Sequence, residues 1–288
     1  VQFGEGGAGT FSDGKLNTQT HDGFNKDVIE LFYKFGAPEE VLYLNKPHIG
    51  SDKLSPILKN MRVFIEANGG KYLFNTQFIG LKQKDGAVSS ITLKNVKTCE
   101  ETEICMDDAV LALGHSARDT FKMLKDNGVE MQRREFAVGV RIEHLSDSIS
   151  FAQYGNNFKF LPTADYKFVS HAGERTVFTF CMCPGGVVVS SSSEEGGVVT
   201  NGMSEYARDG VNSNSALMVQ LKFSDFCSDD LFAGMRYQQN LERLAYEAGG
   251  NSYRAPVQLY KDFKSDKVSY KFGDVEPSYL AGVSFANL

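Results

Sequence analysis

Residues 77–93 read QFIGLKQKDGAVSSITL, and the pattern of this stretch decides much of the expected fold. In each half, polar and apolar residues alternate in the manner of strands with one buried face. Asp85-Gly86 lies between the halves and favours a tight hairpin turn. Shorter strand-like runs at Tyr72 to Phe74 and Thr102 to Met106 flank the pair. The sequence therefore predicts a small antiparallel meander.

The run from Asp108 to Leu113 is continuously apolar after its first residue and leads into Gly114. Helical spacing follows at Thr120 to Asn127. An unbroken apolar strand, a glycine turn and a helix are what a parallel sheet covered on both faces requires. We therefore predict an α/β fold in which residues 108–113 form a buried strand.

Two domains are expected, 1–131 and 132–288, because the meander, apolar run and helix end before Gln132 and a new series of strand-like runs begins after Arg133. The first domain should also contain helices near residues 26–35 and 54–65, where apolar residues keep helical spacing. The second should contain strands at 136–142, 175–181 and 216–223, a helix at 229–248 and a loop-rich tail after Ala255.

The composition of the chain argues against several classes of function. The 288 residues are 42% hydrophobic and carry a net charge of −6, so the chain lacks the excess of cations that binds nucleic acid or an anionic membrane. No apolar run approaches the ~20 residues of a membrane span. We expect a soluble cytoplasmic protein with a small-molecule substrate. Because the chain starts at Val1 rather than Met, we also expect it to be an excerpt of a longer protein.

Cysteine usage supports a reducing compartment. The five cysteines are an odd number without a Cys-x-x-Cys pair or histidines at zinc spacing, so neither a disulfide framework nor a metal site is expected. They are Cys99, Cys105, Cys181, Cys183 and Cys227.

The glycine-rich opening is the first candidate site. Gly4 to Gly9 matches G-x-G-x-x-G, and Gly9 to Lys15 matches the start of a P-loop. Neither match has its required context, because no strand precedes it and Leu16 replaces the Ser or Thr of a P-loop. What remains is a loop whose backbone N–H groups can approach an anion or a carbonyl-rich ring closely, with a purely structural glycine loop as the alternative.

Two further places carry reactive side chains. His115 follows the predicted buried strand and has the titration range for acid–base catalysis, although such a histidine is also commonly a loop hydrogen-bonding residue. Cys181-Met182-Cys183-Pro184-Gly185-Gly186 places two thiols at the end of a strand. No cation lies near them in the sequence to activate a nucleophile. Residues i and i+2 of a strand point the same way but would form a strained ring, and a cytoplasmic chain meets no oxidant, so we expect the thiols to be reduced rather than paired.

The order of several motifs resembles the bacterial FAD-dependent dehydrogenases of unassigned substrate. These motifs are Gly4 to Leu16, Leu113 to Thr120, Phe136 to His144, Cys183 to Gly186 and Asn201 to Ser204. The resemblance implies a glutathione-reductase-like fold, with a partial FAD/NAD(P)-binding domain that contains the meander and an inserted α+β domain. It further implies an oxidoreductase that uses FAD, with NAD(P)H as a possible electron donor.

The resemblance also suggests roles for individual residues. A flavin would lie near the glycine loop and Gly114. The substrate would meet Arg141, Glu195 and Asn201, while catalytic candidates are Cys183, Arg141 and His115. The residues expected near the flavin in the loop are Gly6, Gly7, Gly9, Thr10, Ser12 and Lys15.

Truncation at both ends would remove the phosphate-binding fingerprint of such a fold. We therefore expect the excerpt to bind FAD weakly, to be inactive alone, and to hold the glycine loop poorly packed. Two alternatives stay open, namely a nucleotide- or anion-binding module without turnover, and a thiol enzyme built on Cys181 and Cys183.

Overall fold

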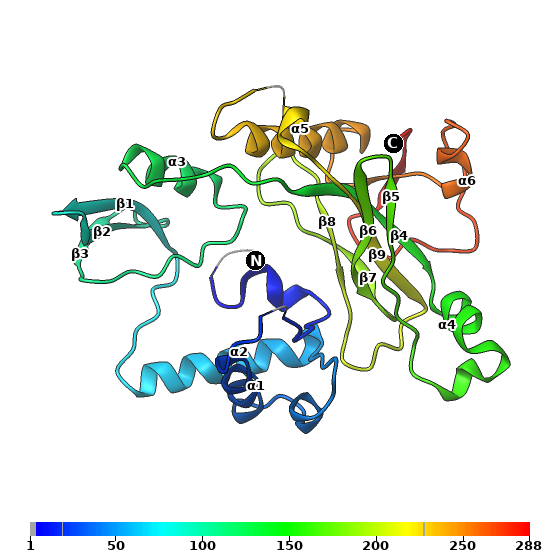
Figure 1. Cartoon of the computed structure of the whole chain (residues 1–288), viewed down its shortest axis with the longest axis horizontal. Helices are drawn as coiled ribbons and strands as arrows, with labels where there is room; N and C mark the ends of the chain where they lie inside the picture. Colours follow the sequence, from blue (N-terminus) through cyan, green and yellow to red (C-terminus); the bar gives the residue numbers. More distant parts are fainter. Residues whose placement is uncertain (1–3, 19, 227) are drawn as a thin grey trace.

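The computed structural model describes residues 4–18, 20–226 and 228–288, so Cys227 lies outside the described part. Figure 1 shows a mixed α/β arrangement in which the meander and the main sheet lie at opposite sides of the N-terminal segment. The helices are α1 (Phe24–Lys34), α2 (Ser51–Ala67), α3 (Arg118–Asp126), α4 (Ser146–Tyr154), α5 (Ala233–Ala248) and α6 (Tyr260–Phe263), with 3-10 turns at Gly7–Phe11, Glu39–Leu42, Gly155–Phe160 and Phe223–Phe226.

The predicted meander is confirmed. Strands β1 (Thr76–Lys84), β2 (Ala87–Asn95) and β3 (Glu101–Cys105) pair antiparallel in that order. Asp85 and Gly86 both adopt positive φ, 53° and 81°, as a two-residue turn with matching twist requires. Tyr72 to Phe74 precedes β1 without joining the sheet, so that part of the prediction is wrong.

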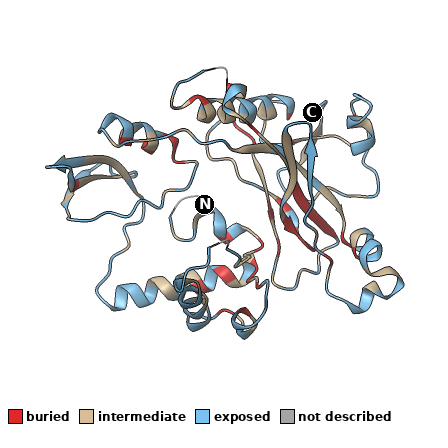
Figure 2. Ribbon diagram, viewed as in Figure 1, coloured by how far each residue is buried: buried red, intermediate tan, exposed pale blue. Residues whose placement is uncertain are grey.

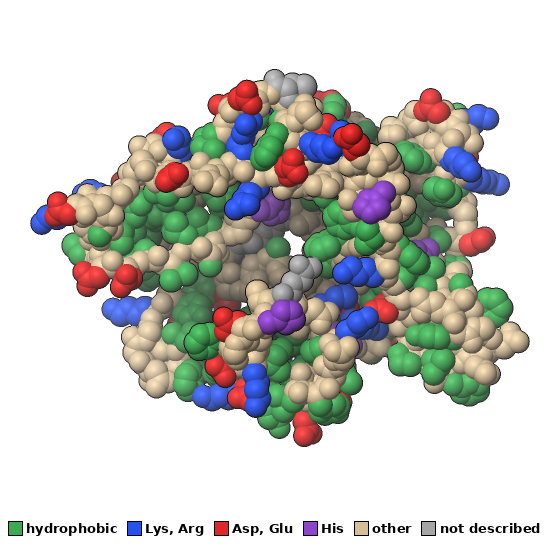
Figure 3. Space-filling model, in the orientation of Figure 1, with side chains coloured by type: hydrophobic (Ala, Val, Ile, Leu, Met, Phe, Trp, Pro, Cys, Tyr) green, Lys and Arg blue, Asp and Glu red, His purple; other side chains and the backbone are tan. Residues whose placement is uncertain are grey.

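The buried strand predicted at 108–113 is also wrong. The segment is irregular, and Val110 is 94% exposed. A strand is stabilised by ladder bonds to a neighbour, and no strand of the described chain pairs with this run. Figure 3 shows hydrophobic side chains at the surface beside the meander. The continuous apolar run at 108–113 indicated a buried segment, but in the structure most of these residues are exposed.

The main sheet is antiparallel, in the order β4–β9–β6–β5. Its strands are β4 (Ala137–Leu145), β5 (Val169–Ala172), β6 (Arg175–Cys183) and β9 (Asn212–Gln220). Strand β9 begins four residues before the predicted start, because residues 212–215, Asn-Ser-Asn-Ser, also pair with β4 and are buried although polar. Their polarity concealed a central strand, visible among the buried elements in Figure 2.

Smaller sheets complete the second half of the chain. Strands β7 (Val187–Ser190) and β8 (Thr200–Met203) pair antiparallel, and β10 (Ala255–Val257) and β11 (Val283–Phe285) pair parallel. Helix α5 starts four residues later than predicted, after the Asp230 carboxylate accepts a hydrogen bond from Phe232 N at 2.8 Å. No helix in the described residues has the length and apolarity needed to cross a membrane.

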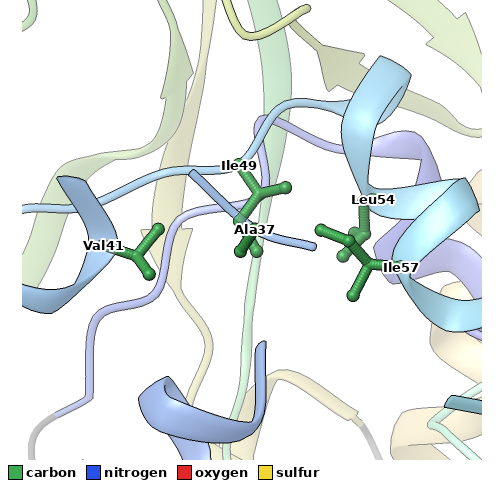
Figure 4. Close-up of a cluster of buried hydrophobic side chains, with 5 residues drawn as sticks. All are labelled: Ala37, Val41, Ile49, Leu54 and Ile57. Carbon is green, nitrogen blue, oxygen red and sulfur yellow. The ribbon is translucent and has the colours of Figure 1, made fainter. Parts of the chain in front are cut away.

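The N-terminal segment packs around a separate small core. Apolar side chains from the turn after α1, the segment before α2 and α2 itself converge there: Ala37, Val41, Ile49, Leu54 and Ile57 (Figure 4). Hydrogen bonds from Ile49 N to Gly14 O and from Gly50 N to Asp13 O attach the glycine loop beside this core. The end of the loop is therefore attached to this core, so the expectation of a poorly packed loop is wrong for Asp13 to Lys15, whereas Gly6, Ala8 and Gly9 are exposed.

Helix α3 is anchored to the second half of the chain by a buried ion cluster. Arg118 is 2% exposed, and its guanidinium pairs with Glu194 at 3.0 Å and donates two hydrogen bonds to Glu242 on α5. A buried guanidinium is tolerated where carboxylates neutralise it, and removal of one partner leaves the others uncompensated.

Arg118→Met should therefore lower the free energy of unfolding by about 3 kcal/mol or more, as measured by urea denaturation. The control is Arg236→Met, which removes an exposed pair with Asp230 and should cost below about 1 kcal/mol. Equal losses in the two variants would contradict the role of the buried cluster.

Candidate functional site

The glycine loop forms one wall of a pocket of about 260 Å³. Gly6 and Gly14 adopt φ of 73° and 67°, which lets the loop turn without strain. Ser12 Oγ donates to Gly9 O at 2.7 Å and accepts from Gly14 N at 3.1 Å, so the hydroxyl holds the turn together. The complete lining is Gly6, Gly9, Ser12, Gly14, Lys15, Leu16, Phe32, Leu54 and Leu58. One wall is therefore backbone and cation, and the other is apolar.

Asp13 is the buried anion behind this loop. Its side chain is 1% exposed, pairs with Lys15 Nζ at 2.6 Å and accepts from Arg208 Nε at 2.8 Å. Burial alone would raise the pKa of Asp13, but the hydrogen bond from Arg208 and the positive charges of Lys15 and Arg208 outweigh it and lower that pKa. The carboxylate thus joins the N-terminal segment to the loop after β8.

Lys15 extends from the pocket to the main sheet. Its ammonium also donates to Met182 O, at the end of β6. Nearby, His48 Nε2 lies 2.9 Å from Tyr206 O, and the two rings stack at a centroid distance of 5.3 Å. The Lys15 bond docks the glycine loop onto the Cys181–Cys183 segment, and the His48–Tyr206 contacts join the segment before α2 to the loop after β8.

That segment contains a β-bulge. Phe180 pairs with Ala216 and Cys183 pairs with Asn214, so two residues of β6 oppose the single residue Ser215 of β9. Cys181 takes a φ of 49°, the left-handed region that residues other than glycine adopt rarely. The bulge places Cys183 beside Asn214 and directs the peptide carbonyls of the segment toward the cations.

Arg141 is the second cation at the bulge. From β4 it donates to Asn214 Oδ1 at 2.6 Å, to Asn201 Oδ1 at 3.2 Å and to Cys181 O at 3.4 Å. A Cβ on Gly202 would collide with Asn214 Oδ1, Arg141 Nη1 and Cys183 Sγ, so glycine is required there. The guanidinium, a thiol and two amides therefore form one compact cluster, called the bulge cluster below.

Cys181 and Cys183 both carry free thiols, as predicted. The sequence supplies no cation close to them, but the fold brings Lys15 and Arg141 to this segment from 167 and 40 positions away. The hydrogen bond with Cys183 lowers the pKa of Cys181 to about 6, assisted by the charges of Lys15 and Arg141 against an opposing effect of burial. The same hydrogen bond and burial raise the pKa of Cys183.

The structure brings together only some of the predicted site residues. Gly6, Gly9, Ser12 and Lys15 line the pocket, while Gly7 and Thr10 lie in the 3-10 turn behind it. Arg141, Asn201 and Cys183 meet in the bulge cluster.

The remaining predicted residues lie elsewhere. Gly114 and His115 are exposed, in the turn before α3. Glu195 is also exposed, and it is the neighbouring Glu194 that pairs with Arg118.

Three residues of the site had not been expected from the sequence, namely Asp13, Arg208 and Asn214. Asp13 stands two positions before the predicted Lys15, a spacing that allows an ion pair but does not demand one. Arg208 and Asn214 had no such signal, since their partners lie 195 and 73 positions away.

Comparison with known proteins places this geometry in a family. Residues 135–288, more than half of the chain, match the family described as FAD-dependent protein, C-terminal domain-like. The whole chain is 48% identical to an uncharacterized protein of Clostridium beijerinckii (strain ATCC 51743 / NCIMB 8052). The alignment covers 100% of this chain and 54% of that relative, so the chain spans about half of the relative's length.

The lowered pKa of Asp13 predicts how stability depends on pH. The carboxylate contributes stability above its ordinary pKa of 3.8, and that contribution is lost as the pH falls through the lower pKa of the folded state. Urea midpoints measured from pH 7 to pH 2 should show a loss below about pH 4 that is smaller in Asp13→Asn. At pH 7 the variant should be the less stable protein, because Lys15 and Arg208 lose their counter-charge. Identical acid profiles for the two proteins would contradict this account.

Proposed function

Since this chain belongs to the family of FAD-dependent proteins, we propose that the glycine-loop pocket holds the flavin end of FAD in an oxidoreductase. The observation that carries the proposal is the pocket itself, which combines a glycine backbone, a lysine and an apolar wall. The proposal extends to the whole protein: that it is an oxidoreductase, that NADH or NADPH is its electron donor, and that its substrate is a small molecule.

The lining residues fit a flat, carbonyl-bearing ring. Phe32, Leu54 and Leu58 offer an apolar surface to one side of such a ring. A Cβ on Gly9 would meet nothing within 4 Å, so the backbone there is open to a ligand. Thr10 Oγ1, within the loop, is buried without a hydrogen-bond partner among the described residues.

The size of the pocket supports partial rather than complete coverage of the cofactor. At about 260 Å³ it is smaller than the roughly 300–1,000 Å³ of sites that enclose a drug-sized ligand. The pocket therefore suits the ring end, and the rest of FAD would contact other parts of the protein.

When bound, FAD would supply the chemistry of hydride or electron-pair transfer. The chain's own residues would bind and orient it. Lys15 places a positive charge at the pocket wall, Asp13 fixes the position of that ammonium, and the apolar side chains exclude water. A fixed positive charge favours electron-rich forms of a bound ring.

The substrate side is proposed at the bulge cluster, which Lys15 connects to the pocket. Arg141 and Asn201 offer guanidinium and amide donors for polar groups of a small molecule. Glu195, His115 and Gly114 lie away from this cluster in the described chain and have no part in the proposal.

The direct test is flavin content in the full-length protein. Leu58→Trp would fill the pocket and should lower the flavin bound per protein by roughly tenfold, read from the visible absorbance of the purified protein. Val63→Trp is the matched control, since Val63 lies on the same helix but is 52% exposed and does not line the pocket. Equal flavin content in both variants would place FAD elsewhere.

Reduction of the bound flavin distinguishes an oxidoreductase from a module that binds FAD without turnover. We expect NADH or NADPH to bleach the flavin absorbance under anaerobic conditions. If the protein retains FAD but neither NADH nor NADPH reduces it, the result would favour a binding module without turnover.

A further inference from the structure

Arg141 is a partly buried cation that forms no ion pair with a carboxylate among the described residues. Its guanidinium donates to Asn214 Oδ1, Asn201 Oδ1 and the carbonyl of Cys181, all of which are neutral. Glu143, two positions along β4, has its carboxylate hydrogen-bonded to other polar groups. Partly buried charges are usually neutralised by an opposite charge, so Arg141 calls for an anion.

Arg118 has the usual surroundings of a buried arginine. Burial lowers the pKa of Arg118, but the hydrogen bond and charge of Glu242 and the charge of Glu194 outweigh this effect, so the pKa is raised. At Arg141 burial outweighs the effect of every neighbour and lowers the pKa. Arg141 has therefore lost hydration without gaining a counter-charge.

Two N–H groups of the Arg141 guanidinium remain available. A guanidinium has five N–H donors, and three of them are used in the bonds to Asn214, Asn201 and Cys181. Neither the Nε–H nor the second Nη2–H has an oxygen acceptor in the described part of the chain. A carboxylate can accept from two N–H groups of one guanidinium at once, and it is the anion that this pair of donors suits.

Asn214 fixes the orientation of Arg141 and reveals the same shortage of acceptors. Its side chain is 0% exposed, and Oδ1 accepts from Arg141 Nη1 at 2.6 Å. Nδ2, on the other arm of the amide, is buried and has no acceptor among the described residues. Buried amide donors are nearly always satisfied, so this part of the bulge cluster holds more donors than acceptors.

An exposed aromatic ring lies on the same face of the main sheet. Residues paired across neighbouring strands point to the same face, and Ala216 pairs with Arg141 on one side and with Phe180 on the other. Arg141 and Phe180 are therefore two strands apart, with roughly 10 Å between their backbones. Phe180 is 61% exposed, and the side chain of Ala216 between them is a single methyl group. A small molecule can thus reach the cation and the ring together.

We propose that the substrate is an organic carboxylate with an apolar body, and that Arg141 binds the carboxylate while Phe180 contacts the body. The word substrate rests on the proposed function, whereas the binding site itself does not require FAD. Asn214 and Asn201 are positioning residues that hold the guanidinium in place. Lys15, which donates to the end of β6, connects this site to the flavin pocket.

The test is a calorimetric titration of the full-length protein with benzoate, benzamide and acetate. Benzoate should bind, and benzamide should bind at least roughly tenfold more weakly because it has the ring without the charge. Acetate should bind several-fold more weakly than benzoate, because it has the charge without the ring. No binding of benzoate, or equal affinities for benzoate and benzamide, would overturn the proposal.

Variants assign the two contacts. Arg141→Gln should weaken benzoate binding by roughly tenfold or more, and Arg141→Lys should recover part of the loss because it keeps the charge without the paired donors. Phe180→Ser should weaken the binding of benzoate but not that of acetate. Arg134→Gln is the control, because Arg134 is exposed and outside the cluster. Unchanged benzoate affinity in Arg141→Gln would contradict the assignment, and if that variant does not fold, the comparison of benzoate with benzamide on the wild-type protein decides.

Flavin content separates this proposal from the proposed function. Arg141→Gln should retain its flavin, and Leu58→Trp, which should lose flavin, should still bind benzoate. If Arg141→Gln loses its flavin, the anion that Arg141 binds is the pyrophosphate of FAD, and the carboxylate proposal fails. If instead Leu58→Trp keeps its flavin, the FAD site is misplaced, while benzoate binding that depends on Arg141 still supports the carboxylate site.

Discussion

Asp13 is a fully buried carboxylate, and the position of the glycine loop depends on the two cations that surround it. Lys15 comes from the same loop and Arg208 from the loop after β8, so the ion pairs join segments separated by 195 positions. A buried charge is tolerated only with such partners. Because Asp13 fixes Lys15, it also shapes the pocket wall and sets the contact between Lys15 and the end of β6.

The bulge at the end of β6 places the two thiols of the Cys181–Cys183 segment where the glycine loop contacts the main sheet. The extra residue turns the Cys181–Cys183 segment toward Arg141 and Lys15, and it leaves Cys181 in a conformation that glycine would adopt more readily. The cations in turn hold the carbonyls of Cys181 and Met182. Lys15 therefore connects the glycine-loop pocket to the bulge cluster. A change in the N-terminal loop that moves Lys15 should alter the environment of the Cys181 and Cys183 thiols.

Local patterns predicted the local structure well. Alternation and Asp85-Gly86 predicted the meander, and helical spacing predicted α1, α3 and α5 within a few residues. Burial was harder to predict, since it depends on partners distant in the sequence. The apolar run at 108–113 lacks a neighbouring strand, whereas the polar start of β9 is buried, where Ser213 Oγ hydrogen-bonds to Ser146 and accepts from Gly185 N. The ion pair of Asp13 with Arg208 had no local signature at all.

A double-mutant cycle on Asp13 and Arg208 tests most directly whether their contact holds the two parts of the site together. The cycle compares the free energies of unfolding of Asp13→Asn, Arg208→Gln and the double variant with that of the wild-type chain. We expect the two residues to be coupled by about 1–3 kcal/mol, because each variant alone removes one side of a two-point contact to a buried carboxylate, and Lys15 remains as the other cation. A coupling energy within about 0.3 kcal/mol of zero would mean that the two side chains act independently, and it would contradict this account of how the site is built.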